Sequence, residues 1–313
     1  SEFGGDGGGR LRITADVLKI DGAIKADGGT GVNGAALNGG GGAGGSIRLD
    51  VGDLVGAGTV SADGGDAGGS NDLGQPGGGG RVLVNTSGAF TLDAAHISAF
   101  PGTAPVGRAG PGSVVYIDGG NTTLVIDDGG SSAGFDAPSR PDAFDASKVP
   151  ASVDVEVRGT THLVVTNPLV VRSLHLQDTA VLSHAETTTA NSPTLMIVTE
   201  TLRIDAGAAI DVTGRGYLGD CSAGNGCTPG GRWLGNALGG AGRYGGGSHG
   251  GTAAGASNPV YGDPTAPDTL GAGGGYGNGG GEPGGDGGGR MRLVVGALIV
   301  EGEVRADGET GFK

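Results

Sequence analysis

Positive charge is scarce in this chain of 313 residues, and its scarcity excludes several classes of partner. Lys and Arg number 19 against 33 Asp and Glu, which gives a net charge of −14. A field of that sign repels nucleic acid and anionic membrane surfaces. Only 4% of the residues are aromatic, and no basic stripe with interleaved aromatics occurs. No apolar run reaches the roughly 18 residues that a spanning helix needs, so neither nucleic-acid binding nor membrane insertion is expected.

Cysteine is nearly absent. Cys221 and Cys227 are the only two, six positions apart in CSAGNGC. Metal-binding pairs sit closer together and come with further ligands, which this segment lacks. A local disulfide that closes a short loop is the preferred interpretation. Such a bond indicates an oxidising compartment, which is the cell surface, the periplasm or the extracellular space.

Glycine is the abundant residue, with 75 of the 313 positions. Collagen needs glycine at every third position and much proline, whereas here glycine comes in blocks and proline numbers 14. A disordered linker lacks the Val, Ile and Leu runs that separate these blocks. The composition therefore indicates a folded chain of unusual backbone.

Long internal repeats organise the sequence. GGDGGGRLRITADVLKIDGAIKADGGTG at 4–31 returns at 284–311 as GGDGGGRMRLVVGALIVEGEVRADGETG, with 15 of 28 residues identical. A third relative at 44–65 aligns with the first at a spacing of 36. A unit that recurs in this way needs a copy of itself to bury its apolar face. Residues 1–3 precede the pattern and are interpreted as a cloning remnant, so a missing signal peptide carries no information.

The repeated segment alternates apolar and polar residues with a period of two, which predicts short half-buried strands. Helical spacing is absent, and no two-residue Asn-Gly turn separates strands with mirrored patterns. The expected fold is therefore all-β: one domain over 1–313 forming a right-handed parallel β-helix (a β-solenoid) with long Gly-rich loops. Two long loops interrupt the coil, an Asp- and Pro-rich one at 127–150 and the longest Gly-rich stretch at 214–289. Inward stacks are predicted for Leu18, Leu54 and Leu298, and repeated Asp-Gly corners for Asp27, Asp63 and Asp307.

Four motifs together resemble the Gly-rich β-helical repeats of very large secreted or surface-exposed bacterial proteins, many of them adhesin-like. They are GGSIRLDVGDLVGAGTVSADGGDAGG at 44–69, AAIDVTGRGYLG at 208–219, YGDPTAPDTLGAGGG at 261–275 and GGDGGGRMRLVV at 284–295. That family carries no agreed catalytic motif. The resemblance implies a non-enzymatic, extracellular or cell-surface segment that acts as a stiff stalk or fibre. Neighbouring repeats of the same parent chain would be its partners, and a cell-surface glycan or protein would contact its loops.

An alternative is a carbohydrate-active enzyme, a polysaccharide lyase or hydrolase, on the same scaffold. Such enzymes need two or three clustered acids. Asp27, Asp63 and Asp307 would supply them if they formed a column. Each precedes a glycine at a predicted corner, where Asp is favoured for hydrogen bonding to the backbone. The corner role is preferred, and no catalytic residue is assigned.

Two groups of side chains are candidate metal ligands. Five acidic side chains in one loop could offer oxygen ligands to Ca²⁺, but their spacing matches neither an EF-hand nor a β-roll repeat; they are Asp127, Asp128, Asp136, Asp142 and Asp145. A solvated acidic loop is preferred, and no cofactor is expected. A zinc site at His162, His175 and His184 would require three layers of matching length, so outward-facing strand histidines are the simpler interpretation.

Most aromatic residues gather in the loop at 214–289, where Arg side chains accompany them. The candidate ligand-binding set is Trp233, Tyr217, Tyr244, Tyr261, Tyr276, Arg232 and Arg243. Rigid aromatic rings can stack on sugars or on a protein surface, which would make this segment a glycan-binding module. The preferred alternative is a small internal core, because a loop of this length needs something to hold it.

Overall fold

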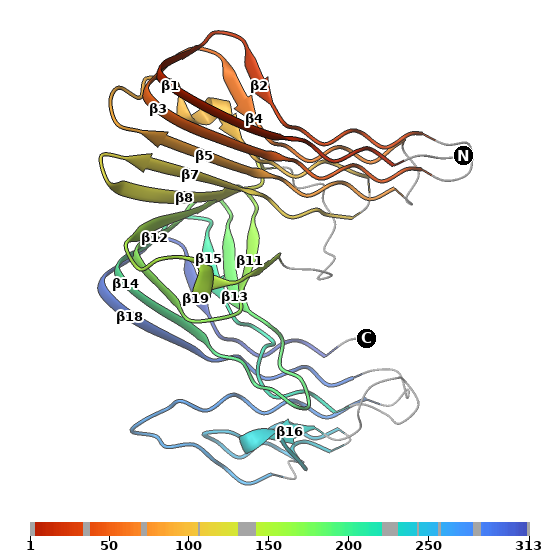
Figure 1. Ribbon diagram of the computed structural model, residues 1–313. Helices are drawn as coiled ribbons and strands as arrows, with labels where there is room; N and C mark the ends of the chain where they lie inside the picture. Colours follow the sequence, from red (N-terminus) through yellow and green to blue (C-terminus); the bar gives the residue numbers. More distant parts are fainter. Residues whose placement is uncertain are drawn as a thin grey trace.

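The computed structural model describes residues 4–33, 38–69, 74–105, 107–130, 142–220, 231–242, 244–255, 258–277 and 283–311. These residues form layered β-strands, and Figure 1 shows the layers following one another down the molecule. No α-helix occurs among them, so they contain no helix long and apolar enough to cross a bilayer. Three short 3₁₀ turns are present, at Ala94–His96, Ala146–Lys148 and Leu234–Asn236. The all-β prediction is confirmed.

One large sheet carries the fold, in the order β1-β3-β5-β7-β8-β10-β12-β14-β18. All neighbours are parallel except β7 and β8. The bounds are β1 Arg10–Ile20, β3 Ser46–Gly56, β5 Arg81–Thr86, β7 Ser113–Asp118, β8 Asn121–Asp127, β10 Val153–Arg158, β12 Leu169–Leu176, β14 Leu195–Ile204 and β18 Met291–Val300.

A short strand follows most of the long strands and belongs to one of two smaller parallel sheets. The first is β2-β4-β6, with β2 Ala23–Lys25, β4 Thr59–Ser61 and β6 Ile97–Ser98. The second is β19-β15-β13-β11-β9, with β9 Asp142–Phe144, β11 His162–Val165, β13 Val181–His184, β15 Ala209–Asp211 and β19 Glu303–Arg305. An antiparallel pair, β16 Arg232–Trp233 and β17 Ala237–Leu238, stands apart from these.

The spacing of 36 residues correctly predicts the register of the first layers. Leu18 pairs with Leu54, and Ile24 pairs with Val60. Leu298 does not join this stack, because it pairs with Leu202 at the opposite end of the sheet and is 49% exposed. The predicted inward stack therefore holds for Leu18 and Leu54 only.

The expectation of uninterrupted parallel layers is wrong at one place, the β7–β8 hairpin. Gly119 and Gly120 form its two-residue turn with φ values of 55° and 90°, a left-handed conformation that glycine adopts without strain. The tetrapeptide Asp118-Gly119-Gly120-Asn121 is thus a hairpin signal in the sequence. Strands on either side of it run in opposite directions, which divides the molecule into a first stack (β1–β7) and a second stack (β8–β15 with β18 and β19).

The two stacks bury opposite faces of the shared sheet. On the hairpin, Val114 and its partner Val125 belong to the core of the first stack. Val115 and its partner Leu124 pack with the core of the second. Because successive side chains alternate between the faces of a strand, these two pairs point in opposite directions. The hairpin is consequently apolar on both sides, whereas other strands of the sheet have one outward polar face.

Within the described residues, the glycine-rich segments form hydrogen-bonded layers and not the loops expected from the sequence. In the first stack, Gly28 and Gly31 donate to the carbonyls of the next layer at 2.8 and 2.9 Å. Gly42 and Gly45 donate to residues 29 and 26, at 2.9 and 2.7 Å. Bonds that recur every three residues match an extended helix of polyproline II type. Figure 1 shows these segments as wavy parallel traces that extend beside the sheet.

A second array uses the segments 217–220, 271–274 and 284–288. Tyr217 donates its N–H to Gly271, Gly271 donates to Gly288, and Gly287 donates back to Tyr217, at 3.0, 3.2 and 2.9 Å. The three segments therefore bond in a closed ring. The predicted loop at 214–289 contains this array and the β16–β17 hairpin.

Close approach of backbones explains why glycine is needed in these arrays. A Cβ atom on Gly77 would lie 2.0 Å from the carbonyl oxygen of Gly42, and a Cβ on Gly42 would lie 2.0 Å from that of Asp6. Neither glycine has a left-handed φ. The missing side chain, and not conformational freedom, is what the packing requires.

Neighbouring glycines provide a matched test of this packing. Gly77→Ala is expected to destabilise the protein by about 1–3 kcal/mol, because the new methyl group overlaps a backbone oxygen. Gly78→Ala is the control, since its Cβ would meet nothing closer than 3.6 Å. Urea unfolding measures both, and equal effects would contradict the close-approach argument.

Candidate functional site

The repeated aspartates join one layer to the next. Asp27 accepts hydrogen bonds from the Ser61 hydroxyl at 3.0 Å and from the Asp63 N–H at 2.9 Å. Asp63 in turn accepts from the Ser98 hydroxyl at 3.0 Å and the Phe100 N–H at 2.7 Å. Both carboxylates accept from a backbone N–H, as the corner role predicts. That N–H belongs to the following layer, however, and not to the corner that contains the Asp.

Asp307 does not join this column. It lies exposed on the last layer, at the far end of the molecule from Asp27 and Asp63. The three acids that a lyase or hydrolase would need are therefore not brought together.

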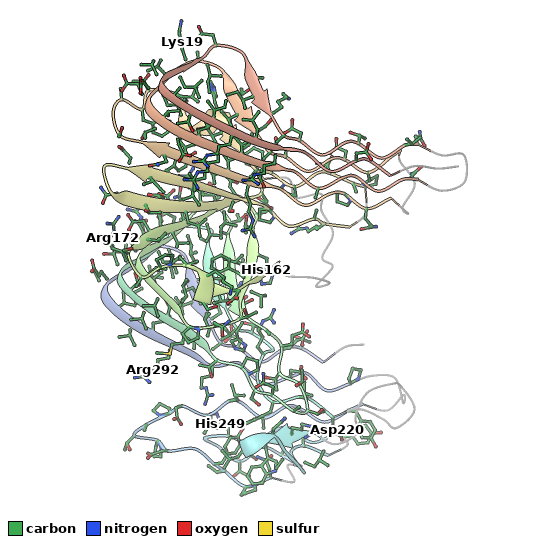
Figure 2. The ribbon with its side chains drawn as sticks, in the orientation of Figure 1. Lys19, His162, Arg172, Asp220, His249 and Arg292 are labelled. Carbon is green, nitrogen blue, oxygen red and sulfur yellow. The ribbon has the colours of Figure 1, made fainter. Side chains whose placement is uncertain are left out.

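Outward charges also connect neighbouring layers. On the first stack, Asp50 accepts from Arg12 and Arg48, at 3.1 and 2.8 Å, and from Asn85 at 3.3 Å. The Arg48 guanidinium holds the pKa of the Asp50 carboxyl well below its usual range. Figure 2 shows Arg172 projecting from the sheet of the second stack, where it pairs with Asp154. Except for the pair of Arg48 and Asp50 within β3, these contacts join neighbouring layers on the solvent side of the sheet.

The acidic loop that was considered for Ca²⁺ uses its carboxylates locally. Asp127 accepts from the Gly129 N–H at 2.7 Å, and Asp128 accepts from the Gly130 and Thr160 N–H groups at 3.0 and 2.8 Å. Asp145 caps the turn Ala146–Lys148 through the Ser147 N–H at 3.1 Å. Asp136 and the Asp142 side chain lie outside the described residues. Within the part of the chain that is described, no three metal-ligating side chains gather.

The three strand histidines occupy separate places. His162 lies on β11 (Figure 2). Its Nε2 shares a hydrogen bond of 2.9 Å with the Ser183 hydroxyl. His175 contacts Asp205 at 2.9 Å on the outer face of the sheet. His184 is buried, and burial lowers the pKa of its imidazole. The three side chains do not come together, and His184 is buried, whereas the sequence predicts an outward-facing position for it.

A small core joins two aromatic residues of the C-terminal lobe (residues 231–277), Trp233 and Tyr261, to Tyr217 of the second glycine array. The Tyr261 ring packs against Trp233 and Tyr217, with ring centroids 5.7 and 6.4 Å apart, and against His249 at 4.7 Å. The Tyr261 hydroxyl donates to the Leu270 carbonyl at 2.8 Å. Burial raises the pKa of Tyr261 well above its usual value. Figure 2 labels His249 within this lobe.

The remaining members of the predicted aromatic set lie elsewhere. Arg232 donates to the Asn236 carbonyl at 2.7 Å, within the hairpin that carries Trp233. Tyr244 is 63% exposed, and its N–H bonds the carbonyl of Tyr276 at 3.0 Å. Arg243 and both cysteines, Cys221 and Cys227, lie outside the described residues. The structure thus unites Trp233, Tyr217 and Tyr261, the small core preferred on sequence grounds.

A cavity of about 180 Å³ lies where the first stack ends, and sequence reasoning missed it. Its lining includes Phe100, Tyr116, Asp127 and Arg158. The small sheet β2-β4-β6 stops at β6, so the hairpin face above the cavity has no further short strand to pack against. Burial raises the pKa of Tyr116 to about 12 and also raises the pKa of Asp127. The lining offers one phenol, one carboxyl and one guanidinium to a small polar molecule.

Asp286 is the most perturbed carboxyl outside these features. It lies in the second glycine array and accepts from the Gly219 N–H at 2.7 Å. Burial, together with the charges of Glu309 and Glu186, raises the pKa of Asp286 to about 6. A carboxyl of that pKa exchanges its proton near neutral pH, which is a property of general acids and also of strained structural acids.

Comparison of the chain with protein-family models, with curated proteins and with solved structures finds no match. The residues themselves must therefore support any functional conclusion.

The raised pKa of Asp286 predicts a pH-dependent stability. The folded state holds this proton more tightly than the unfolded state, so the stabilisation is present below about pH 4 and is lost as the pH rises to about 6. Asp286→Asn removes the charge, and the unfolding free energy at pH 7.5 should rise by about 1 kcal/mol after allowance for solvent screening. Urea unfolding at pH 4 and pH 7.5 measures it. A substitution effect that does not differ between the two pH values would contradict the assignment.

Proposed function

We propose that the chain is a non-enzymatic extracellular segment of a large repetitive bacterial surface protein, which acts as a stiff stalk or fibre. Its two stacks would be coils of a right-handed parallel β-helix. The reversal of strand direction at β7–β8 coincides with a change in the buried face of the sheet. When strand direction and buried face are both reversed along one axis, the coil keeps the same handedness. The two stacks therefore wind with the same hand, which supports one type of coil in both.

One observation carries the proposal: the acidic side chains that could serve in catalysis form hydrogen bonds between layers and do not gather at one site. Asp27 and Asp63 each accept two hydrogen bonds from the following layer. Charged hydrogen bonds of this kind stabilise a fold by roughly 1.5–3 kcal/mol each. A layered structure tied at its Asp corners and on the outer face of its sheet resists bending, as a stalk requires.

Substitution of Asp63 separates the stalk from the polysaccharide lyase or hydrolase. Asp63→Ala should lower the unfolding free energy by about 2 kcal/mol, because the Ser98 hydroxyl and the Phe100 N–H lose their acceptor. Asp16, exposed on the same stack, is the control, and Asp16→Ala should change stability by less than about 0.5 kcal/mol.

Both variants are also assayed for turnover of acidic and neutral polysaccharides. Turnover by the unmodified chain that disappears in Asp63→Ala at unchanged stability would overturn the stalk and favour the enzyme.

The C-terminal lobe is the proposed contact region. The β16–β17 hairpin carries Trp233, and its neighbours Leu234 and Leu238 are 43% and 58% exposed. The Trp233 ring packs on Tyr261 but is only partly buried, and a part-exposed ring beside exposed apolar side chains suits stacking on a sugar or on a protein surface. The lobe would therefore supply the adhesive contact while the stacks supply stiffness.

A glycan array tests this contact. Signal from the unmodified chain should fall at least about tenfold in Trp233→Ala, which removes the ring that would stack on a sugar. Val260→Ala, at an exposed position of the same lobe, should retain the signal. Equal loss in both variants would contradict a specific role for Trp233.

A further inference from the structure

The two copies of the repeated sequence occupy the two ends of the molecule. Residues 4–31 form the first layer with β1 and β2, and residues 284–311 form the last layer with β18 and β19. Each end layer has one neighbour in its sheet and one free edge. A free edge of a parallel sheet presents unpaired N–H and C=O groups to another strand.

The two end layers share one conformation. β2 and β19 occupy matching positions, 280 residues apart. The bond from the Gly29 N–H to the Asp6 carbonyl, 2.7 Å, returns as the bond from Glu309 to Asp286, 2.8 Å. A Cβ on Gly8 would lie 2.0 Å from the Ala26 oxygen, and its counterpart on Gly288 would lie 1.9 Å from that of Ala306. The last layer is therefore folded as a first layer.

The covered edges of the two end layers are opposite ones. β1 pairs with β3, which follows it in the chain, whereas β18 pairs with β14, which precedes it. In both layers the same positions face the core: Leu11 and Ile13 in one, Met291 and Leu293 in the other. The first copy therefore shows the repeated layer with the neighbour that follows it, and the second copy shows it with the neighbour that precedes it.

Apolar side chains are exposed at the free edge of the last layer, whereas β3 and β4 cover the matching edge of the first layer. Leu298 and Val304 are 49% and 40% exposed. Their counterparts Leu18 and Ile24 pair with Leu54 and Val60, both fully buried. The C-terminal lobe thus leaves this part of the edge open.

Backbone donors on the same edge are open as well. In the first layer, the Gly5 and Gly8 N–H groups donate to the carbonyls of Gly40 and Ala43, both at 2.8 Å. Within the described residues, no carbonyl accepts from the corresponding N–H groups of Gly285 and Gly288.

From these observations we propose that residues 284–311 are the first layer of a following copy of this unit, and that residues 38–69 of that copy dock on the free edge of β18 and β19. The second stack of one copy would then continue into the first stack of the next as one uninterrupted core. This proposal rests on the proposed function, since it names the partner and the register of the fibre.

Two polar contacts should form at this junction. Arg292 corresponds to Arg12, whose guanidinium donates to Asp50 of the next layer. Asp307 corresponds to Asp27, whose carboxylate accepts from Ser61 and from the Asp63 N–H. Arg292 and Asp307 are both exposed in the single chain, and Figure 2 shows Arg292 beside the last strand of the sheet. The charges of the edge therefore match those of its proposed occupant.

A repeated chain tests the register directly. Residues 34–313 are appended after Lys313, which preserves the spacing because positions 312 and 313 correspond to 32 and 33. Lys19 pairs with Val55 in the first stack, so Ile299 should pair with Val55 of the second copy. Ile299→Cys with Val55→Cys in the second copy should form a disulfide on oxidation, in a background of Cys221→Ser and Cys227→Ser.

The control pairs Ile299→Cys with Asp53→Cys in the second copy, on the same face but two residues out of register. The proposal expects the Val55 pair to cross-link at least about tenfold faster than the control, because only that pair brings its Cα atoms within disulfide range. Equal rates, or no cross-link in a protein whose circular dichroism matches that of two folded copies, would overturn it.

Hydrogen exchange provides a second measurement that needs no cysteine. The amides of Gly285, Gly288 and the free edge of β18 should exchange quickly in the single chain and at least about tenfold more slowly in the repeated chain. Unchanged exchange would also overturn the junction. The Asp63 experiment uses the single chain, so failure of the junction and failure of the stalk are distinguishable.

Discussion

Burial of both faces of the β7–β8 hairpin is the constraint on which the rest of the structure depends. Val114 and Val125 close one core, and Val115 and Leu124 open the next. Only a strand pair that is apolar on both sides can lie between two cores, because an outward polar side chain would be buried there without a partner. The hairpin lets one sheet serve two stacks, and the strands before and after it must run in opposite directions.

The glycine arrays meet a different requirement, which is contact between backbones. Inside each stack, apolar side chains fill the core that the sheets enclose, and the hydrophobic effect supplies the stabilisation. In the arrays, peptide groups approach so closely that a Cβ would overlap a carbonyl oxygen, as at Gly42 and Gly77. Stabilisation there comes from hydrogen bonds between segments, and such bonds leave few buried peptide groups unpaired. The two kinds of packing share the same layers, so a stack can extend without a change in thickness.

Much of the strand pattern could be predicted because it depends on alternation along short segments. Alternation of apolar and polar residues predicts strands at 152–158, 162–166, 169–176 and 180–183, and β10, β11, β12 and β13 agree with them to within one residue at every boundary. The same pattern predicts a strand at 90–93, but only an isolated bridge from Phe90 to Leu54 forms there. The candidate sites were less predictable. The cavity beside Tyr116 exists because a small sheet stops at β6, and the perturbed Asp286 owes its pKa to neighbours that are distant along the chain.

By itself, the amino-acid sequence determined the period of the strands, the register of the first layers and the small aromatic core around Tyr261, because each depends on residue types at fixed spacing. The tertiary structure alone decided that the hairpin at Gly119 and Gly120 lies between two cores, that the glycine blocks bond into arrays, and that the two sequence copies lie at opposite ends. Those features arise from contacts between segments that are far apart in the chain. The alternation of residue types within one segment does not determine which distant segment will pack beside it.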